Sequence, residues 1–153
     1  MNTSKLQSKL GLPLSVLLLL AVLPIPRALG HDLKLLDEGD LVNKILVFVP
    51  LIVWVVVVLW KKAPKPFMTL LAVGLIYGIL LGIVHQITWV GFWNGNIPSV
   101  GGSLAGQISP TTEAIILRIV TFISSVITGL LTGVIIGVIA LGMRHIQRTF
   151  FKK

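Results

Sequence analysis

Residues 41–60 read LVNKILVFVPLIVWVVVVLW, a run in which Lys44 is the only charged side chain. An α-helix needs about 20 consecutive apolar residues to cross the hydrocarbon core of a bilayer. Asp40 stands where the N-cap of such a helix is expected, and Pro50 is expected to kink it. The stretch therefore predicts a membrane-spanning helix over residues 41–60.

The rest of the chain has the same character. Of its 153 residues, 55% are hydrophobic and only 12% are charged, and the mean hydropathy is +0.98. A soluble domain of this size could not bury so much apolar surface. Because the length suits one domain, we expect residues 1–153 to form a single domain in the lipid bilayer.

Two further apolar runs are long enough to span a membrane, at residues 67–89 and 114–143. Ser109 and Pro110 precede the second run, as an N-cap and a proline at the first helical position. That run has about 30 residues, so its helix is expected to tilt or to project beyond the bilayer. The stretch 91–106 is rich in turn-forming residues and carries no charge, which predicts an external loop.

The N-terminal apolar run, residues 10–28, has two interpretations. Basic residues precede it and Ala28-Leu29-Gly30 closes it, as in a cleaved signal peptide of residues 1–30. The run is long for a signal peptide and short for a span, and prolines are expected to bend it. We favour an uncleaved first helix. The predicted fold is then an all-α integral membrane bundle of four transmembrane helices, or of three after cleavage.

Charges are distributed unevenly between the two sides of these spans. The connection after the second span and the segment after the last one are basic, with Lys61, Lys62, Lys65, Arg144, Arg148, Lys152 and Lys153. All five acidic residues fall on the other side: Asp32, Asp37, Glu38, Asp40 and Glu113. The positive-inside rule predicts a multi-pass protein of the cell membrane with a cytoplasmic C-terminus. Its basic tail, residues 144–153, is expected to lie on anionic headgroups.

Small residues recur every four positions in the last two spans. One ladder is Gly74, Gly78 and Gly82, and the other is Ser125, Gly129, Gly133 and Gly137. Steps of four residues drift by only about 40° around a helix, so each ladder forms one stripe. Such stripes let helix backbones approach closely in lipid. We expect these two helices to pack on each other; alternatively, one stripe faces a second copy or a partner membrane subunit.

A polar cluster is the second feature that could carry a function. His85 and Arg118 each fall about 20° from the small-residue stripe of their own helix and about 6 Å below the outer boundary. Ionisable residues within spans are candidates for function. With Gln86 and an outer carboxylate, Glu113 or Asp40, they would form a site for an anion or a proton. The simpler interpretation is that Arg118 extends to the interface and His85 bonds one backbone carbonyl.

Other kinds of site lack the residues that they need. The chain has no cysteine, so thiolate chemistry is excluded. His31, His85 and His145 are expected outside, within and inside the membrane, so no metal or other cofactor is predicted. Ser124 and Ser125 lie some 39 residues from His85, several turns away, and no catalytic residues are expected. The net charge of +8 flanks apolar runs instead of forming one patch, which argues against nucleic acid.

These observations leave three candidate functions. The first is a non-enzymatic accessory or structural membrane component that acts through helix–helix packing. The alternatives are a small transporter or channel with a polar site at His85 and Arg118, and a holin-like pore former. In size the chain is similar to small four-helix drug exporters, and its size and basic tail resemble those of phage-type holins. The exporters carry an essential carboxylate in their first helix, and residues 10–28 contain none.

Overall fold

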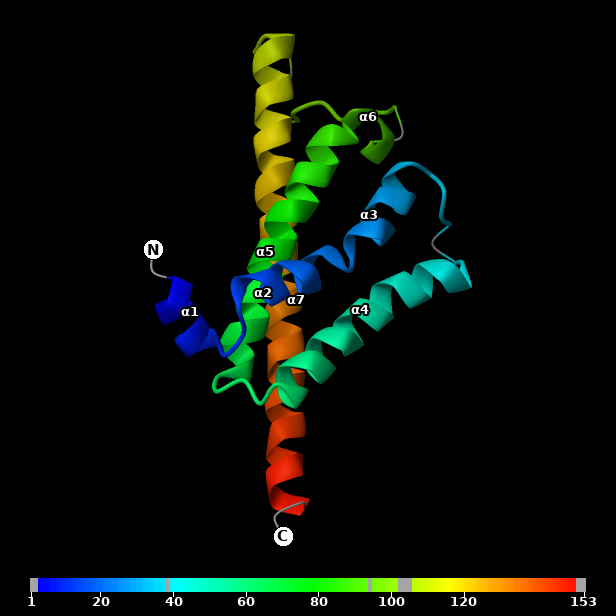
Figure 1. Ribbon diagram of the computed structural model, residues 1–153. Helices are drawn as coiled ribbons and strands as arrows, with labels where there is room; N and C mark the ends of the chain where they lie inside the picture. Colours follow the sequence, from blue (N-terminus) through cyan, green and yellow to red (C-terminus); the bar gives the residue numbers. More distant parts are fainter. Residues whose placement is uncertain (1–2, 38, 94, 102–105, 151–153) are drawn as a thin grey trace.

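The chain is an all-α membrane bundle with four helical segments that are long and apolar enough to cross a bilayer (Figure 1). The computed structural model describes residues 3–37, 39–93, 95–101 and 106–150, and within these ranges it contains no strand. Glu38 and the last three residues of the predicted tail, 151–153, lie outside the described residues. The predicted fold class is confirmed.

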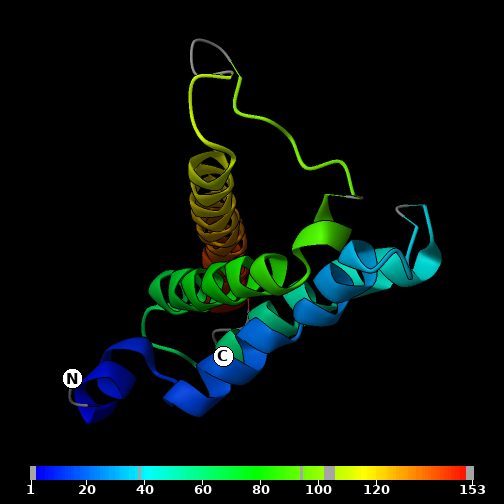
Figure 2. The same cartoon turned by 90° about the horizontal axis from the view of Figure 1, so that it is seen from above.

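The helices follow one another in a simple order. They are α1 (Thr3–Leu10), α2 (Leu14–Val22), α3 (Ile25–Asp32), α4 (Leu41–Trp60), α5 (Pro66–Ile87), α6 (Trp89–Phe92) and α7 (Pro110–Phe150). The first span, Leu14–Asp32, consists of α2 and α3 together, and the other three are α4, α5 and α7. Seen from above, α5 lies between α7 on one side and α2, α3 and α4 on the other (Figure 2). Every other span therefore packs on α5.

The first span is broken between α2 and α3 because Pro24 has no backbone N–H. The carbonyl of Leu20, four residues earlier, lacks its usual helical partner and accepts a hydrogen bond from Trp54 Nε1 at 2.7 Å. A weaker bond from the Leu23 N–H at 3.2 Å completes the turn. Trp54 comes from α4 and is fully buried. The proline break thus fastens the first span to the second.

Helices α5 and α7 are antiparallel and touch backbone to backbone along the two small-residue ladders. A Cβ atom added to Gly78 would lie 2.9 Å from the carbonyl oxygen of Ser125. A Cβ atom added to Gly133 would lie 2.9 Å from the carbonyl oxygen of Leu70. Both distances are well inside van der Waals contact, so only residues without side chains fit at this interface.

The ends of the two ladders meet aromatic rings instead of backbone. Gly82 faces the ring of Phe122, and Gly137 faces the ring of Phe67. Both stripes are therefore occupied within the chain. A second copy or a partner subunit would have to meet a different surface.

Helix α7 is longer than the apolar run from which it was predicted. It has 41 residues, against an expected range of 114–143. At 1.5 Å per residue it is about 60 Å long, roughly twice the thickness of the hydrocarbon core. At its start, Ser109 Oγ accepts the Thr112 N–H at 3.2 Å, which caps the first turn beyond the apolar run.

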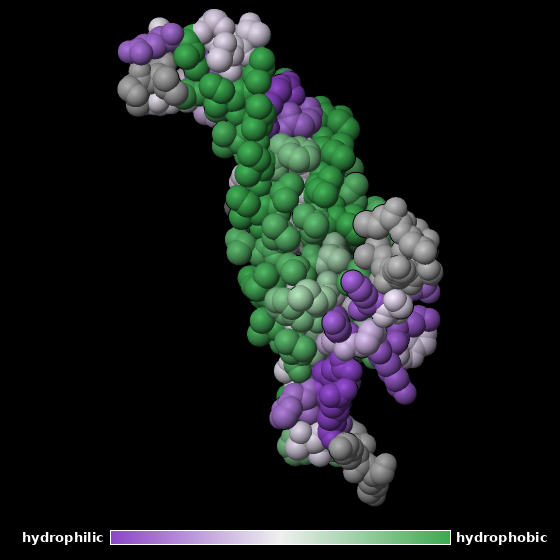
Figure 3. Space-filling model, turned by 90° about the vertical axis from the view of Figure 1, so that its left-hand side faces the viewer, coloured by the Kyte–Doolittle hydropathy of each residue, from purple (hydrophilic) through white to green (hydrophobic). Residues whose placement is uncertain are grey.

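The two ends of the bundle differ in charge. Basic residues gather where α4, α5 and α7 meet, and Nη1 of Arg144 donates to the carbonyls of Ala63, at 3.1 Å, and Pro64, at 2.9 Å. The space-filling view shows a hydrophobic middle with hydrophilic residues collected toward this end (Figure 3). The described acidic residues lie near the opposite end, at the ends of α3, α4 and α7 that face away from it.

Candidate functional site

Asp32, the last residue of α3, carries a buried carboxylate where the first span meets the end of α5 and the short helix α6. Its side chain is only 1% exposed. One oxygen, Oδ2, accepts hydrogen bonds from His85 Nδ1 at 2.8 Å and from Thr88 Oγ1 at 2.5 Å. The other, Oδ1, lies 3.6 Å from His31 Nδ1. A buried carboxylate is costly unless donors surround it, and these groups meet that requirement.

Helix α6 holds this pair in place from above. A Cβ atom on Gly91 would overlap the backbone carbonyl oxygen of Asp32, so only glycine lets α6 lie this close to the end of α3. The ring of Phe92 packs on the imidazole of His85, with centroids 4.1 Å apart and a tilt of 35°. Since Nδ1 of His85 bonds Asp32, the ring orientation is fixed and Nε2 is left for another partner.

A cleft of about 410 Å³ opens beside the Asp32–His85 pair, between α3, α5, α6 and α7. Its polar lining residues are Arg27, His31, Asp32, Tyr77, His85, Trp93, Thr121, Ser124, Ser125 and Thr128. The indole Nε1 of Trp93 is buried and has no hydrogen-bond partner among the described residues. This cleft is the candidate functional site.

The cleft reaches from the end of the bundle at α6 to about the middle of α5. His85 lies near the end of α5 and Tyr77 at its centre, so eight residues, or about 12 Å, separate them along the helix. Across the cleft, hydroxyl groups of α7 line a similar length. Two of these hydroxyls are occupied locally, because Ser125 Oγ donates to the Thr121 carbonyl at 2.8 Å and Thr128 Oγ1 to the Ser124 carbonyl at 3.0 Å.

Arg27 adds a positive charge to the wall of the cleft. Its Nε donates to Oδ1 of Asn43 at 3.2 Å, and Asn43 is a buried residue of α4. This bond leaves the terminal nitrogens of the guanidinium for the cleft, because arginine carries five N–H donors. The sequence pattern did not connect Arg27 with His85.

The structure separates the predicted polar site into two parts. Arg118 does not bond His85: its Nη1 donates to Oε1 of Gln86 at 3.2 Å and to the Gln86 carbonyl at 3.4 Å. In return, Nε2 of Gln86 donates to the Arg118 carbonyl at 3.2 Å. The guanidinium also stacks on Trp89, 4.6 Å from the ring centroid. Gln86 and Arg118 thus join α5 to α7 outside the cleft.

Neither carboxylate considered for His85 reaches it. Glu113 accepts the backbone N–H of Val100 at 2.5 Å and ties the loop between α6 and α7 to the start of α7. Asp40 accepts the Asp37 N–H at 3.4 Å, in the turn before α4. Asp32 takes this role because the first span continues past residue 28 and brings its carboxylate to α5.

A signal for Asp32 was present in the sequence. Four of the buried residues of the first span, Leu17, Ala21, Ala28 and Asp32, fall within about 60° on a helical wheel, whereas Leu20 and Gly30 lie outside that sector. Extending that periodicity beyond Pro26 would have put Asp32 on the inner face. The prolines obscured it, since they suggested that the helix ended there.

The geometry of the cleft bears on two kinds of chemistry, metal binding and catalysis by a serine with a histidine. Among the described residues, no three His, Asp or Glu side chains converge as metal ligands would. Antiparallel packing does bring Ser124 and Ser125 to the same cleft as His85. In the register where Gln86 faces Arg118, they lie roughly 8 Å deeper than His85.

Comparison of the chain with protein-family models, with curated proteins and with solved structures finds no match.

Proposed function

We propose that this chain is a non-enzymatic multi-pass membrane component of the small transporter or channel type. In this role the cleft admits a small polar solute or a proton from the outer side. The observation that carries the proposal is the buried Asp32–His85 pair at the outer end of a polar cleft that extends down to Tyr77.

The energetics of membrane burial support this role. A charged group at membrane depth is expensive, and such groups normally mark ion or substrate pathways. Here Arg27, Asp32 and His85 lie within or at the end of spans and share one cleft. A pair held only for stability would be served as well by apolar side chains of similar volume. The cleft beside it is therefore best explained as a place for water and a polar guest.

The second candidate is the accessory component that acts through helix contacts with a second copy or a partner membrane subunit. It is favoured by the depth of the cleft, which ends where Gly78 of α5 meets the backbone of α7 near Ser125. A path that stops halfway needs either a conformational change or another protein to complete it. The holin-like alternative remains a prediction.

The proposed location is the cell membrane, with the C-terminus in the cytoplasm. The basic residues of the α4–α5 turn and the end of α7 support it through the positive-inside rule. The cleft would then open toward the outside.

Cysteine accessibility tests whether the cleft holds water, because the natural chain has no cysteine. Ser124 lines the cleft, and Ile123, the residue before it, is 52% exposed on the apolar surface of the same helix. Ser124→Cys and Ile123→Cys therefore form a matched pair. We expect a charged, membrane-impermeant thiol reagent added outside to modify Ser124→Cys much faster than Ile123→Cys. Equal rates at the two positions would refute a wet cleft.

Flux through proteoliposomes separates the two candidates. For a transport role, His85→Ala abolishes proton flux, read by an internal pH dye, and leaves the folded protein intact. His145→Ala, at the basic end, is the matched control and keeps the flux. For an accessory role, no flux is seen in the chain alone, and His85→Ala leaves both the folded protein and its assembly with a partner unchanged.

A further inference from the structure

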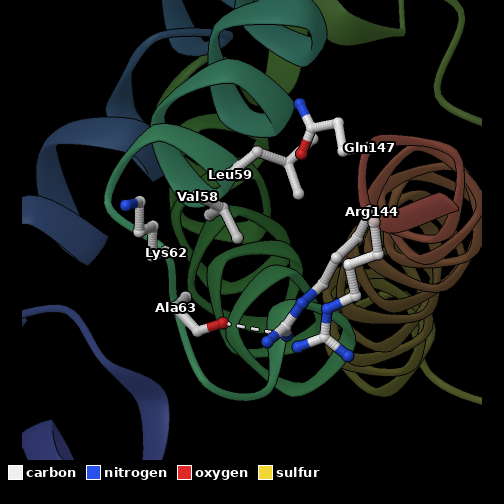
Figure 4. Close-up of a pocket in the computed structure, with 7 residues that line it drawn as sticks. Val58, Leu59, Lys62, Ala63, Arg144 and Gln147 are labelled. Carbon is white, nitrogen blue, oxygen red and sulfur yellow. Dashed lines mark hydrogen bonds between the residues drawn. The ribbon is translucent and has the colours of Figure 1, made fainter. Parts of the chain in front are cut away.

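A second pocket lies at the opposite end of the bundle from the cleft. It has a volume of about 320 Å³ and is formed by the end of α4, the turn that follows it and the end of α7. Figure 4 shows the apolar Val58 and Leu59 between Lys62 on one side and Arg144 and Gln147 on the other. Arg148 also lines it. The volume is at the low end of the range for ligand pockets, about 300–1,000 Å³.

The charge in this pocket is entirely positive. Lys62, Arg144 and Arg148 contribute three cations, and none of the described carboxylates lines it. The Lys62 ammonium points away from Arg144 in Figure 4, as like charges do. Three cations close together repel one another unless an anion lies between them.

One of these cations is held in a fixed position. Nη1 of Arg144 donates to the carbonyls of Ala63 and Pro64, in the turn that Lys62 begins. Its other N–H groups have no partner among the described residues and can bind an anion from a prepared geometry. A guanidinium matches the spacing of phosphate oxygens and binds them in pairs.

The position of the pocket relative to the bilayer indicates the source of the anion. Trp60, 75% exposed at the end of α4, stands where aromatic residues meet the headgroup region. The Nζ of Lys61 lies over the ring of Trp60, 5.0 Å from the ring centroid. The apolar lining residues, Val58 and Leu59, precede Lys62 by about one turn and so lie deeper in the spanning segment, toward the acyl chains. A ligand with a phosphate and an apolar body fits both sets of lining residues.

We infer that this pocket binds the phosphate headgroup of an anionic phospholipid, with the glycerol and upper acyl chain against Val58 and Leu59. Basic pockets between helices at the cytoplasmic interface recognise such headgroups by charge. The inference does not rest on the proposed transport role, since it uses different residues at the other end of the bundle.

The backbone at Lys62 provides a variant that removes charge without harming the fold. Its φ of 50° is in the left-handed region that favours glycine, and it terminates α4 with bonds from Lys62 N to Leu59 O and from Ala63 N to Val58 O. Lys62→Gly therefore deletes the ammonium and relieves strain. Lys34, with a φ of 56° in the same motif after α3, offers Lys34→Gly as a matched control.

The test measures binding of short-chain phosphatidylglycerol and phosphatidylcholine to the full chain in detergent by native mass spectrometry. We expect preference for the anionic lipid, and about fivefold weaker binding for each of Lys62→Gly and Arg148→Gln. Lys34→Gly keeps the preference, and Lys62→Gly melts no lower than the natural chain. Excess inorganic phosphate leaves the lipid bound.

Three results would overturn the inference. Equal binding of the two lipids excludes recognition of the anionic headgroup. A loss in Lys34→Gly as large as that in Lys62→Gly assigns the effect to net charge and not to the pocket. Displacement of the lipid by inorganic phosphate identifies a site for a free anion.

Discussion

Replacing Gly129 by alanine adds one methyl group where α7 lies closest to α5. The added carbon would overlap the carbonyl oxygen of Gly74 and the Cα of Gly78, which cannot move aside unless α5 moves as a whole. Overpacking of this kind costs about 1–3 kcal/mol. Alanine recovers up to about 1 kcal/mol in helix propensity. We expect the free energy of unfolding to fall by up to about 2 kcal/mol.

The same helix contains its own control for this experiment. Gly142 has nothing within 4 Å of an added Cβ atom, so Gly142→Ala gains helix propensity without a clash. Reversible unfolding of the two variants in mixed micelles, followed by circular dichroism, compares them directly. If Gly129→Ala proves as stable as Gly142→Ala, the two helices do not touch backbone to backbone and the ladder argument fails.

Three further outcomes follow from named contacts. Trp54→Phe removes the donor to the Leu20 carbonyl and is expected to lower the free energy of unfolding by about 1 kcal/mol, measured in the same micelles; an unchanged value would mean that the proline-freed carbonyl needs no such partner. Asp32→Ala strands two buried donors and should cost about 1–3 kcal/mol, more than Asp32→Asn, which keeps an acceptor; equal losses would argue against hydrogen bonding as the cause. Because the first span supplies core residues, we expect the intact mass of purified protein to include residues 1–30, and a product that starts at His31 would contradict this.

The spans were predictable because the hydropathy of consecutive residues along the sequence is enough to identify them. Helix α4 occupies residues 41–60, as its apolar run indicates, since lipid selects a continuous helix over that length. The ends of α7 were not predictable in this way. Polar residues continue the helix into water at both ends, where hydropathy carries no information about helix length.

The candidate site was only partly accessible from sequence. Helical periodicity on α5 singled out His85, which the structure places in the cleft. Its carboxylate partner could not be chosen, because Asp32, Asp40 and Glu113 all lie outside the apolar runs. The choice depends on how far the first span continues after a proline, and on an α6 turn that approaches it through Gly91. The first leaves only a periodicity that the prolines obscure, and the second is a tertiary contact without a local sequence pattern.

Helix α7 is one continuous helix that is hydrogen-bonded to another segment of the chain at each end. Its N-terminal end is tied through Glu113 to Val100 in the loop between α6 and α7, and its C-terminal end through Arg144 to the turn after α4. An unbroken helix of about 60 Å resists bending, so its extremities cannot be displaced independently. A displacement of the loop between α6 and α7 is therefore expected to reach the pocket at Arg144 as a tilt or rotation of α7. The helix therefore couples the movements of the two loops that are bonded to its ends.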